Sequence, residues 1–131
     1  MSIFFTERTD AGNAIALPVT LLAHLGDAVF HLFEREREIF NAGNARQMHS
    51  RVNSRVNAEK QAELLELLTE HLTETELDLV RRARNVKASN FKRAIQKVSR
   101  KATAFEALLG YLYLEDLPRL REILALTASI D

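Results

Sequence analysis

The chain has 131 residues, of which 47% are hydrophobic and 27% charged, and its formal net charge is zero. This length and composition suit one compact domain with its own core and leave too few residues for a second. Cysteine is absent, which excludes disulfide bonds, thiolate zinc sites and cysteine nucleophiles. We expect a single domain over residues 1–131, with residues 1–16 as an N-terminal extension.

The beginning of the chain carries no sign of a targeting segment. The sequence MSIFFTERTDAG lacks the basic start and the apolar stretch of a secretory signal peptide. No stretch approaches the roughly 18 consecutive apolar residues that a membrane-spanning helix requires. A chain without cysteine also suits a reducing compartment. We therefore expect a soluble, cytoplasmic protein that has no membrane partner.

The first predicted helix begins after Pro18, because proline is tolerated at the start of a helix. Apolar residues then recur three and four positions apart, so a helix with one buried face is predicted from Val19 to about Ile39. Asp27 lies inside this apolar stretch, directly after Gly26. A glycine within a helix usually permits another backbone or a ligand to approach, and a carboxylate near a core needs a partner.

Turn residues at 41–44 separate this helix from a shorter and more polar helix, or a helix with a break, over residues 45–57. The helical pattern resumes at Ala58. The sequence Thr73-Glu-Thr-Glu76 resembles a capping box, in which a threonine and a glutamate satisfy free backbone amides at the start of a helix. The helix that it opens is predicted to end near Arg84.

The last part of the chain is also helical by pattern. Residues 88–90 are expected to form a loop or cap before a helical stretch over 91–98. Residues 102–114 are apolar on nearly all sides, which predicts the central helix of a bundle. A final helix is predicted over residues 117–128. No strand-like alternation and no internal repeat occur, so the expected fold class is all-α.

The neutral total conceals a separation of charge along the chain. Between Glu59 and Asp78 nearly all charged residues are acidic, whereas no acid occurs from Leu79 to Phe105. Such a basic segment is either a solvated helix face or a surface that binds phosphate groups. Its basic residues are Arg81, Arg82, Arg84, Lys87, Lys92, Arg93, Lys97, Arg100 and Lys101.

Glu106 repeats the oddity of Asp27, because the residues around it, from Thr103 to Gly110, carry no other charge. Two acids on separate apolar helices favour a site for a hard cation such as Mg²⁺ or Mn²⁺, which prefers oxygen ligands. Such a site leaves coordination positions for water and phosphate, as metal-assisted phosphodiester hydrolysis requires. The alternatives are an Asp27 on the exposed edge of its helix and a buried acid paired with an arginine.

Two histidines share a face of the first helix but do not suggest a metal site. His24 and His31 are two helical turns apart, which is too far for both to bind one metal ion with the usual spacing. We interpret both as structural or surface residues.

Two segments resemble the acidic motifs of the ribonuclease III catalytic domain: Leu25-Gly-Asp-Ala-Val29 and Phe105-Glu-Ala-Leu-Leu-Gly110. The full pattern is most similar to the Mini-III subfamily, which has this catalytic domain without a double-stranded-RNA-binding domain. Gln61-Ala62 and Arg81-Arg-Ala-Arg-Asn85 lie between the two motifs and strengthen the resemblance. The similarity extends over about 17–124, which is nearly the whole chain.

The resemblance implies a ribonuclease III-type helical domain, and a homodimer whose two active sites flank an RNA-binding valley. It implies Mg²⁺, with Mn²⁺ as a possible substitute, held by Asp27 and Glu106, which are the predicted catalytic and metal-binding residues. The implied reaction is endonucleolytic cleavage of double-stranded regions of structured RNA, notably large-subunit ribosomal RNA precursors, with 5′-phosphate products. The residues that we expect to contact the RNA are Arg81, Arg82, Arg84, Asn85, Lys87 and Lys101.

The chain also departs from the ordinary ribonuclease III pattern. Thr20 and Ala23 replace two glutamates of the first motif, and Thr103 replaces an aspartate of the second. The resemblance therefore leaves open whether one or two cations act. The main alternative is a catalytically inactive RNA-binding or ribosome-associated helical module that keeps the fold without the metal. A helical protein-interaction adaptor would instead expose a broad apolar face.

Overall fold

All regular structure in the computed structural model, which describes residues 13–86 and 93–130, is helical. The predicted all-α class is thereby confirmed, and no strand occurs within these ranges. Two short 3₁₀ helices, Ala14–Ala16 and Thr69–His71, accompany six α-helices in the described residues. The α-helices are α1 (Val19–Glu38), α2 (Ala45–Val56), α3 (Ala58–Leu68), α4 (Glu74–Arg84), α5 (Arg93–Glu115) and α6 (Leu117–Ile130).

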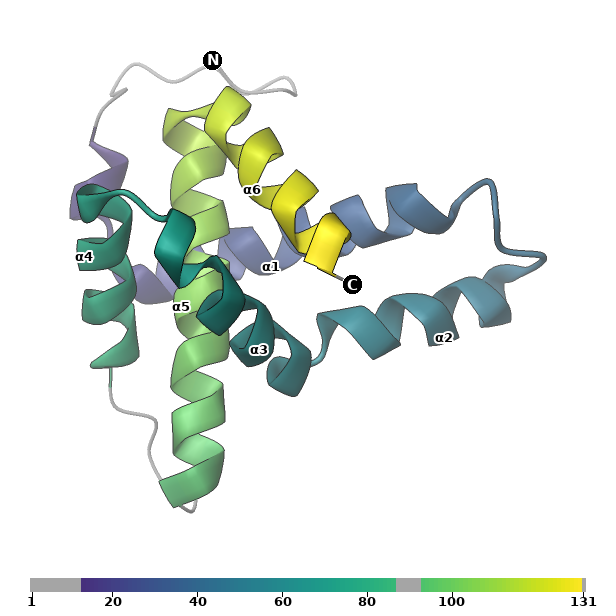
Figure 1. Cartoon of the computed structure of the whole chain (residues 1–131), viewed down its shortest axis with the longest axis horizontal. Coiled ribbons are helices and arrows are strands. Elements are labelled where there is room, and N and C mark those ends of the chain that lie inside the picture. Colours follow the sequence, from purple (N-terminus) through teal and green to yellow (C-terminus); the bar gives the residue numbers. More distant parts are fainter. Residues whose placement is uncertain (1–12, 87–92, 131) are drawn as a thin grey trace.

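The helix α5 runs through the middle of the molecule and contacts α1, α3, α4 and α6 (Figure 1). Its apolar residues form the centre of the core, as the sequence of residues 102–114 predicts. Phe105 and Phe30 of α1 are fully buried and meet edge to face, with ring centroids 4.9 Å apart. Aromatic pairs favour this arrangement, so the two rings help to hold α1 across α5.

Local sequence signals determine where most helices begin. Pro18 directly precedes α1, and the Asn44 side chain accepts a hydrogen bond from the Gln47 amide at the start of α2. The capping box predicted for α4 is present: Thr73 Oγ1 accepts from the Glu76 amide, and the Glu76 carboxylate accepts from the Thr73 amide. These contacts satisfy amides that have no partner within the helix.

One prediction about the helices was incomplete. The stretches expected over 91–98 and 102–114 belong to a single helix as far as the structure describes them, because α5 continues without a break from Arg93. The polar residues 99–101 interrupt the apolar pattern but are compatible with a helix interior, so they do not end the helix. The loop or cap expected at 88–90 lies outside the described residues.

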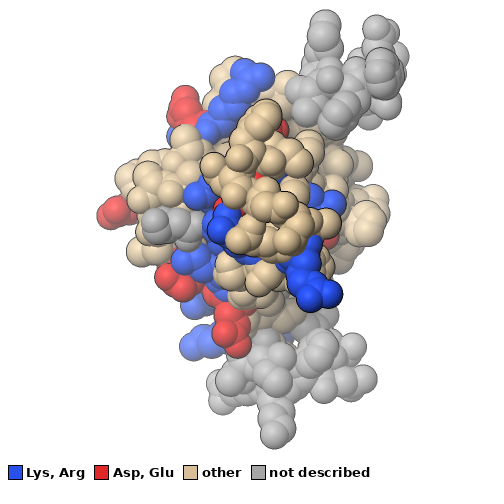
Figure 2. All heavy atoms as spheres, turned by 90° about the vertical axis from the view of Figure 1, so that its right-hand side faces the viewer, with Lys and Arg blue, Asp and Glu red and all other residues tan. Residues whose placement is uncertain are grey.

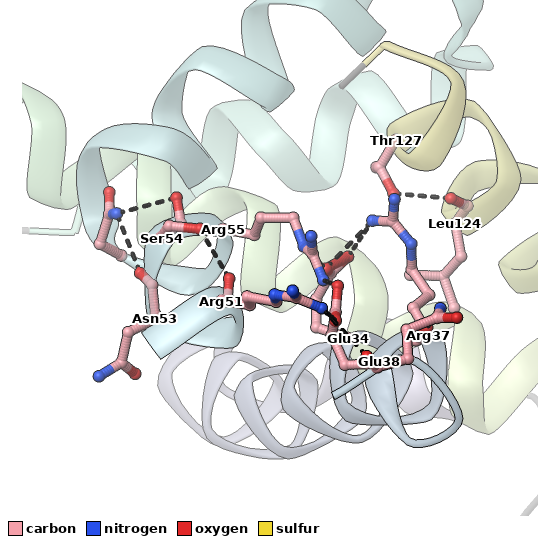
Figure 3. A network of polar contacts seen from close by, with 11 residues as sticks. Glu34, Arg37, Glu38, Arg51, Asn53, Ser54, Arg55, Leu124 and Thr127 are labelled. Atoms are coloured by element: carbon pink, nitrogen blue, oxygen red, sulfur yellow. Dashed lines mark hydrogen bonds and ion pairs between the residues drawn. The ribbon is translucent and has the colours of Figure 1, made fainter. Parts of the chain in front are cut away.

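The second half of α1 projects from the bundle, and α2 returns beside it (Figure 1). A network of charged side chains joins the two helices (Figure 3). Arg55 of α2 reaches two glutamates of α1: its Nε donates to Glu34, and its Nη2 donates to Glu38 Oε1 at 2.5 Å. Arg37 and Arg51 donate further hydrogen bonds to these carboxylates at 2.7 and 3.2 Å.

The two glutamates of this network are buried, with 1% of Glu34 and 8% of Glu38 exposed to solvent. Buried carboxylates are costly unless they are paired and hydrogen-bonded, as they are here. The sequence gives no sign of the pairing, because Glu34 and Glu38 lie in the charged run Glu-Arg-Glu-Arg-Glu, which is typical of a solvated helix. The network therefore holds the projecting α2 on α1.

Figure 2 looks onto this projecting side of the molecule, where uncharged residues occupy the middle of the view and lysines and arginines lie around them. Ile39 and Phe40, at the end of α1, are 54% and 96% exposed. No helix in the described ranges combines the length and apolar character that crossing a membrane requires.

Candidate active site

The two acidic motifs meet where α1 crosses α5, and two glycines allow this crossing to be unusually close. A Cβ added to Gly26 would lie 1.6 Å from the carbonyl oxygen of Glu106, and one added to Gly110 would lie 1.9 Å from that of Leu22. Both distances are far below van der Waals contact, so a larger residue at either position requires the helices to separate. The approach of another backbone that Gly26 predicts is therefore found.

The carboxyl groups of Asp27 and Glu106 are hydrogen-bonded to each other across this crossing. Burial, together with the hydrogen bond to Asp27 and its negative charge, raises the pKa of Glu106 to about 8. Two carboxylates that are in contact repel each other when both are ionised, so the pair retains a proton near neutral pH unless a cation is present.

The acid pair is open to solvent on one side. The side chain of Asp27 is 50% exposed, whereas Glu106 is partly buried. The interpretation of Asp27 as a residue at the exposed edge of its helix is thus correct for its position, although its side chain also meets Glu106. Neither acid needs an arginine for its pairing, because the two carboxyl groups pair with each other. A ligand can therefore reach the pair from the Asp27 side.

Two further side chains hold the acids in place. Gln61 of α3 is 3% exposed; its Nε2 donates to the carbonyl oxygen of Val56 at 2.9 Å, and its side chain is also hydrogen-bonded to Glu106, which opposes the rise in the pKa of that carboxyl. His31 Nε2 lies 3.4 Å from Asp27 Oδ1. Such partners fix the orientation of metal ligands.

The sequence predicts no role for either residue beside the acids. It indicates that His31 is structural or on the surface, yet His31 is four residues after Asp27, a spacing that places the two side chains on one helix face. Gln61 entered only through the family resemblance, and no local pattern could have placed it beside Glu106. Its position depends on how α3 packs against α5.

The donor set fits a hard divalent cation. Two carboxylates that share a proton exchange it readily for a metal ion, which removes their mutual repulsion. In the described part of the chain no group of three or more His, Asp or Glu side chains is placed to hold a metal. Thr20 is exposed, Ala23 is buried and Thr103 is half-buried, so these positions offer no further carboxylate. Asp27 and Glu106 would therefore be the protein's acidic ligands.

The structure brings three of the expected RNA-contacting residues together, whereas Arg82 and Lys101 have other partners. Lys101 Nζ is paired with Glu66 Oε1 at 2.6 Å, and Arg82 Nη2 donates to the carbonyl oxygen of Leu17 at 3.4 Å. Lys87 lies outside the described residues. Arg81, Arg84 and Asn85 line one pocket of about 260 Å³. Lys97 and Arg100, which are not among the predicted RNA contacts, line the same pocket.

Comparisons with known proteins agree with this arrangement of motifs. The model of the ribonuclease III domain family matches residues 21–117, which include both acids. Mini-ribonuclease 3 of Thermosynechococcus vestitus is 45% identical over 113 residues, covering 86% of this chain and 75% of the relative. The Synechocystis relative of that name is 44% identical over 122 residues, covering 93% and 85%, and the Thermoanaerobacter one is 35% identical over 128 residues, covering 95% and 90%.

A solved structure is similar to the fold. The crystal structure of a Fusobacterium nucleatum protein superposes with a TM-score of 0.78, covering 89% of this chain and 96% of that one. The sequences are only 24% identical, so this likeness concerns the fold alone.

Proposed function

Because this chain belongs to the ribonuclease III family, within the group of Mini-ribonuclease 3 proteins, we propose that it is an endoribonuclease that cuts double-stranded regions of structured RNA. Its proposed place of action is the cytoplasm, in the maturation of large-subunit ribosomal RNA precursors. The observation that supports this function most strongly is the pairing of Asp27 with Glu106 where α1 crosses α5.

In the proposed reaction Asp27 and Glu106 hold Mg²⁺, for which Mn²⁺ is a substitute. When bound, the cation supplies positive charge against the scissile phosphate and favours ionisation of the attacking water. Glu106 would give up its proton on binding the cation, and Gln61 would keep its carboxylate oriented. Water attacks the phosphorus and releases a proton to the solvent, the bond from phosphorus to the 3′ oxygen breaks, and that oxygen takes up a proton from the solvent. The products carry 5′-phosphate and 3′-hydroxyl ends, and no side chain acts as a nucleophile.

Contacts with the RNA backbone are assigned to the basic segment around the end of α4. A-form RNA offers its phosphates and 2′-hydroxyls more readily than its base edges, so the protein would recognise shape more than sequence. Arg81, Arg82, Arg84 and Asn85 are exposed and available for such contacts. Lys87 and Lys101 complete the set of proposed RNA contacts. Lys101 must exchange Glu66 for a phosphate in order to take part.

The proposed homodimer would form through one face of α1. The exposed apolar residues Leu21, Ala28 and Leu32 lie four or seven positions apart and therefore share this face, and Leu17 is exposed just before the helix. Leu17, Leu21 and Leu32 are 38%, 59% and 48% exposed. A two-fold axis beside this face would bury these apolar residues, the stripe on α1, against the same residues of a second copy. Ala28 follows Asp27 directly, so each acid pair would adjoin the interface.

The poor supply of acids favours one other function, a catalytically inactive RNA-binding or ribosome-associated helical module. That function needs no cation, and it accounts for the threonine and alanine residues at the three lost acidic positions. It does not account for the close pairing of Asp27 and Glu106, which costs free energy in a protein that has no use for it.

One experiment separates these functions. Purified protein is incubated with a long double-stranded RNA, and with one of its strands alone, in Mg²⁺, Mn²⁺ or EDTA. We expect cleavage of the duplex only, dependent on the cation, with 5′-phosphate ends on the fragments. Binding of the duplex without cleavage in either metal would favour the inactive module. Failure to bind or cleave the duplex would contradict both functions.

A further inference from the structure

A strongly basic pocket lies between the end of α4 and the first half of α5. Arg81, Arg84 and Asn85 line it from α4, and Lys97 and Arg100 line it from α5. All but one of these residues are cationic, and none of the described residues that line the pocket is acidic. Its volume of about 260 Å³ is small for an organic ligand but suits a compact anion.

One residue that lines the pocket, Arg100, carries an unsatisfied donor. The Nε atom of Arg100 is shielded from solvent, and no hydrogen-bond partner for it exists among the described residues. A buried donor without an acceptor is unfavourable, and a charged one especially so. Because Arg100 shares the pocket with Arg81, Arg84 and Lys97, an anion bound there would reduce the repulsion among these cations.

Nearby acids only partly neutralise the pocket. Asp78 forms an ion pair with Arg81 at 2.7 Å. Both side chains are exposed, so this ion pair is weak. Glu66 has a low pKa because of its hydrogen bond to Lys101, with smaller effects from the charges of Arg84 and Lys97. The carboxylate of Glu66 thus interacts mainly with Lys101, so the pocket keeps an excess of positive charge.

The pocket is separate from the acid pair. Arg100 precedes Glu106 by six residues on α5, which corresponds to about 9 Å along the helix axis and about a third of a turn around it. Lys97 is further along the same helix, about half a turn away from Glu106. An anion in this pocket is therefore not the phosphate that Asp27 and Glu106 would act on.

We propose that the pocket between α4 and α5 binds a phosphate group other than the one that is cut. Arginine pairs with phosphate through parallel hydrogen bonds, and three arginines face this pocket. The phosphate comes either from the backbone of the bound RNA, which rests on the proposed function, or from a free phosphate compound such as pyrophosphate. Lys97 and Arg100 thereby gain a role beyond that of a solvated helix face.

The test uses Lys97→Gln, Arg100→Gln and the double variant, with Arg46→Gln on the exposed side of α2 as the control. Binding of a short RNA duplex is measured in EDTA over a series of salt concentrations, so that no cleavage interferes. Binding of pyrophosphate is measured by calorimetry. If the phosphate belongs to RNA, the double variant should bind the duplex about tenfold more weakly than the wild type. The slope of its log binding constant against log salt concentration should fall by about the value for one phosphate contact. Arg46→Gln should bind like the wild type.

The other outcomes are equally defined. Loss of pyrophosphate binding with unchanged duplex binding would support the pocket and assign it to a free phosphate compound. Unchanged binding of both anions in the double variant would overturn the proposal, as would a wild-type protein that binds neither. Lys97 is exposed, so Lys97→Gln keeps the test valid if the double variant fails to fold. Because the assays omit the cation, they are independent of whether the wild type cleaves RNA.

Discussion

The backbone carbonyl oxygen of Glu106 lies so close to Gly26 that a Cβ at that position would be 1.6 Å away from it. This contact brings the axes of α1 and α5 together at the point where each helix carries its isolated acid. Because Asp27 is the next residue after Gly26, its carboxyl group reaches that of Glu106 while both helices continue without a break. The glycine therefore makes the meeting of the two acids possible.

Gly26→Ala should destabilise the protein by about 2 kcal/mol or more, because the new methyl group meets backbone atoms that cannot rotate away. Urea unfolding measures the change. Gly43→Ala is the matched control: its Cβ would lie 3.1 Å from Gln47 Oε1, the end of an exposed side chain that can move. Equal loss of stability in both variants would refute the close crossing of α1 and α5.

Gln61→Leu should weaken the binding of Mn²⁺ by about 10- to 100-fold, because Glu106 loses the amide that orients it. Electron paramagnetic resonance of free Mn²⁺ measures the affinity directly, without RNA or turnover. Gln47→Leu, which removes an exposed glutamine from α2, controls for the general effect of the substitution. An affinity for Mn²⁺ equal to that of the wild type would exclude this role for Gln61.

The metal-free protein should lose stability as the pH rises. The pKa of Glu106 is raised in the folded protein to about 8 from an ordinary value of 4.5, so the folded state binds this proton more tightly than the unfolded state. The stabilisation is complete below pH 4.5 and is lost as the pH rises towards 8. In EDTA, the free energy of unfolding of the wild type should therefore fall over this range by about 1 kcal/mol or more relative to Glu106→Gln.

Denaturant titrations of both proteins at several pH values test this dependence. Addition of Mn²⁺ near pH 8 should restore the stability of the wild type but not that of Glu106→Gln, since the cation takes the place of the proton. Parallel pH profiles for the two proteins in EDTA would contradict the shared proton.

Leu21→Glu should convert the proposed dimer into a monomer, because it places a charge in the middle of the exposed stripe on α1. Light scattering coupled to size-exclusion chromatography measures the mass. Leu67→Glu provides the comparison, because Leu67 is 44% exposed on α3 and should tolerate the same change without effect on the mass. A dimeric Leu21→Glu protein, or a monomeric wild type, would exclude dimerisation through this face.

Much of the fold could be predicted because the signals for it are local. Pro18 directly precedes α1, and the side chains of Asn44 and Thr73 each accept a hydrogen bond from the backbone amide three residues further on. The acids of the site were also detectable, because a carboxylate in an apolar helix contradicts the surrounding pattern. The continuity of α5 was not, since the polar residues 99–101 interrupt the apolar period without interrupting the helix.

Features that depend on the packing of distant helices were beyond the reach of the sequence. The sequence around Glu34 is typical of a solvated helix. Its burial is explained only by Arg55, which α2 brings beside α1. Gln61 likewise acquires its role from α5. The pocket at Arg100 arises because α4 and α5 pack side by side, whereas the sequence indicated only that the segment is basic.

The most direct test of the account is single-turnover cleavage of double-stranded RNA in Mg²⁺ by Asp27→Asn and Glu106→Gln, beside Glu63→Gln, which changes an exposed acid of α3. Each of the first two substitutions removes a carboxylate with little change in volume, so folding and RNA binding should persist. We predict that both abolish cleavage while Glu63→Gln cleaves like the wild type. Normal cleavage by either Asp27→Asn or Glu106→Gln would contradict the assignment of the acid pair as the catalytic site.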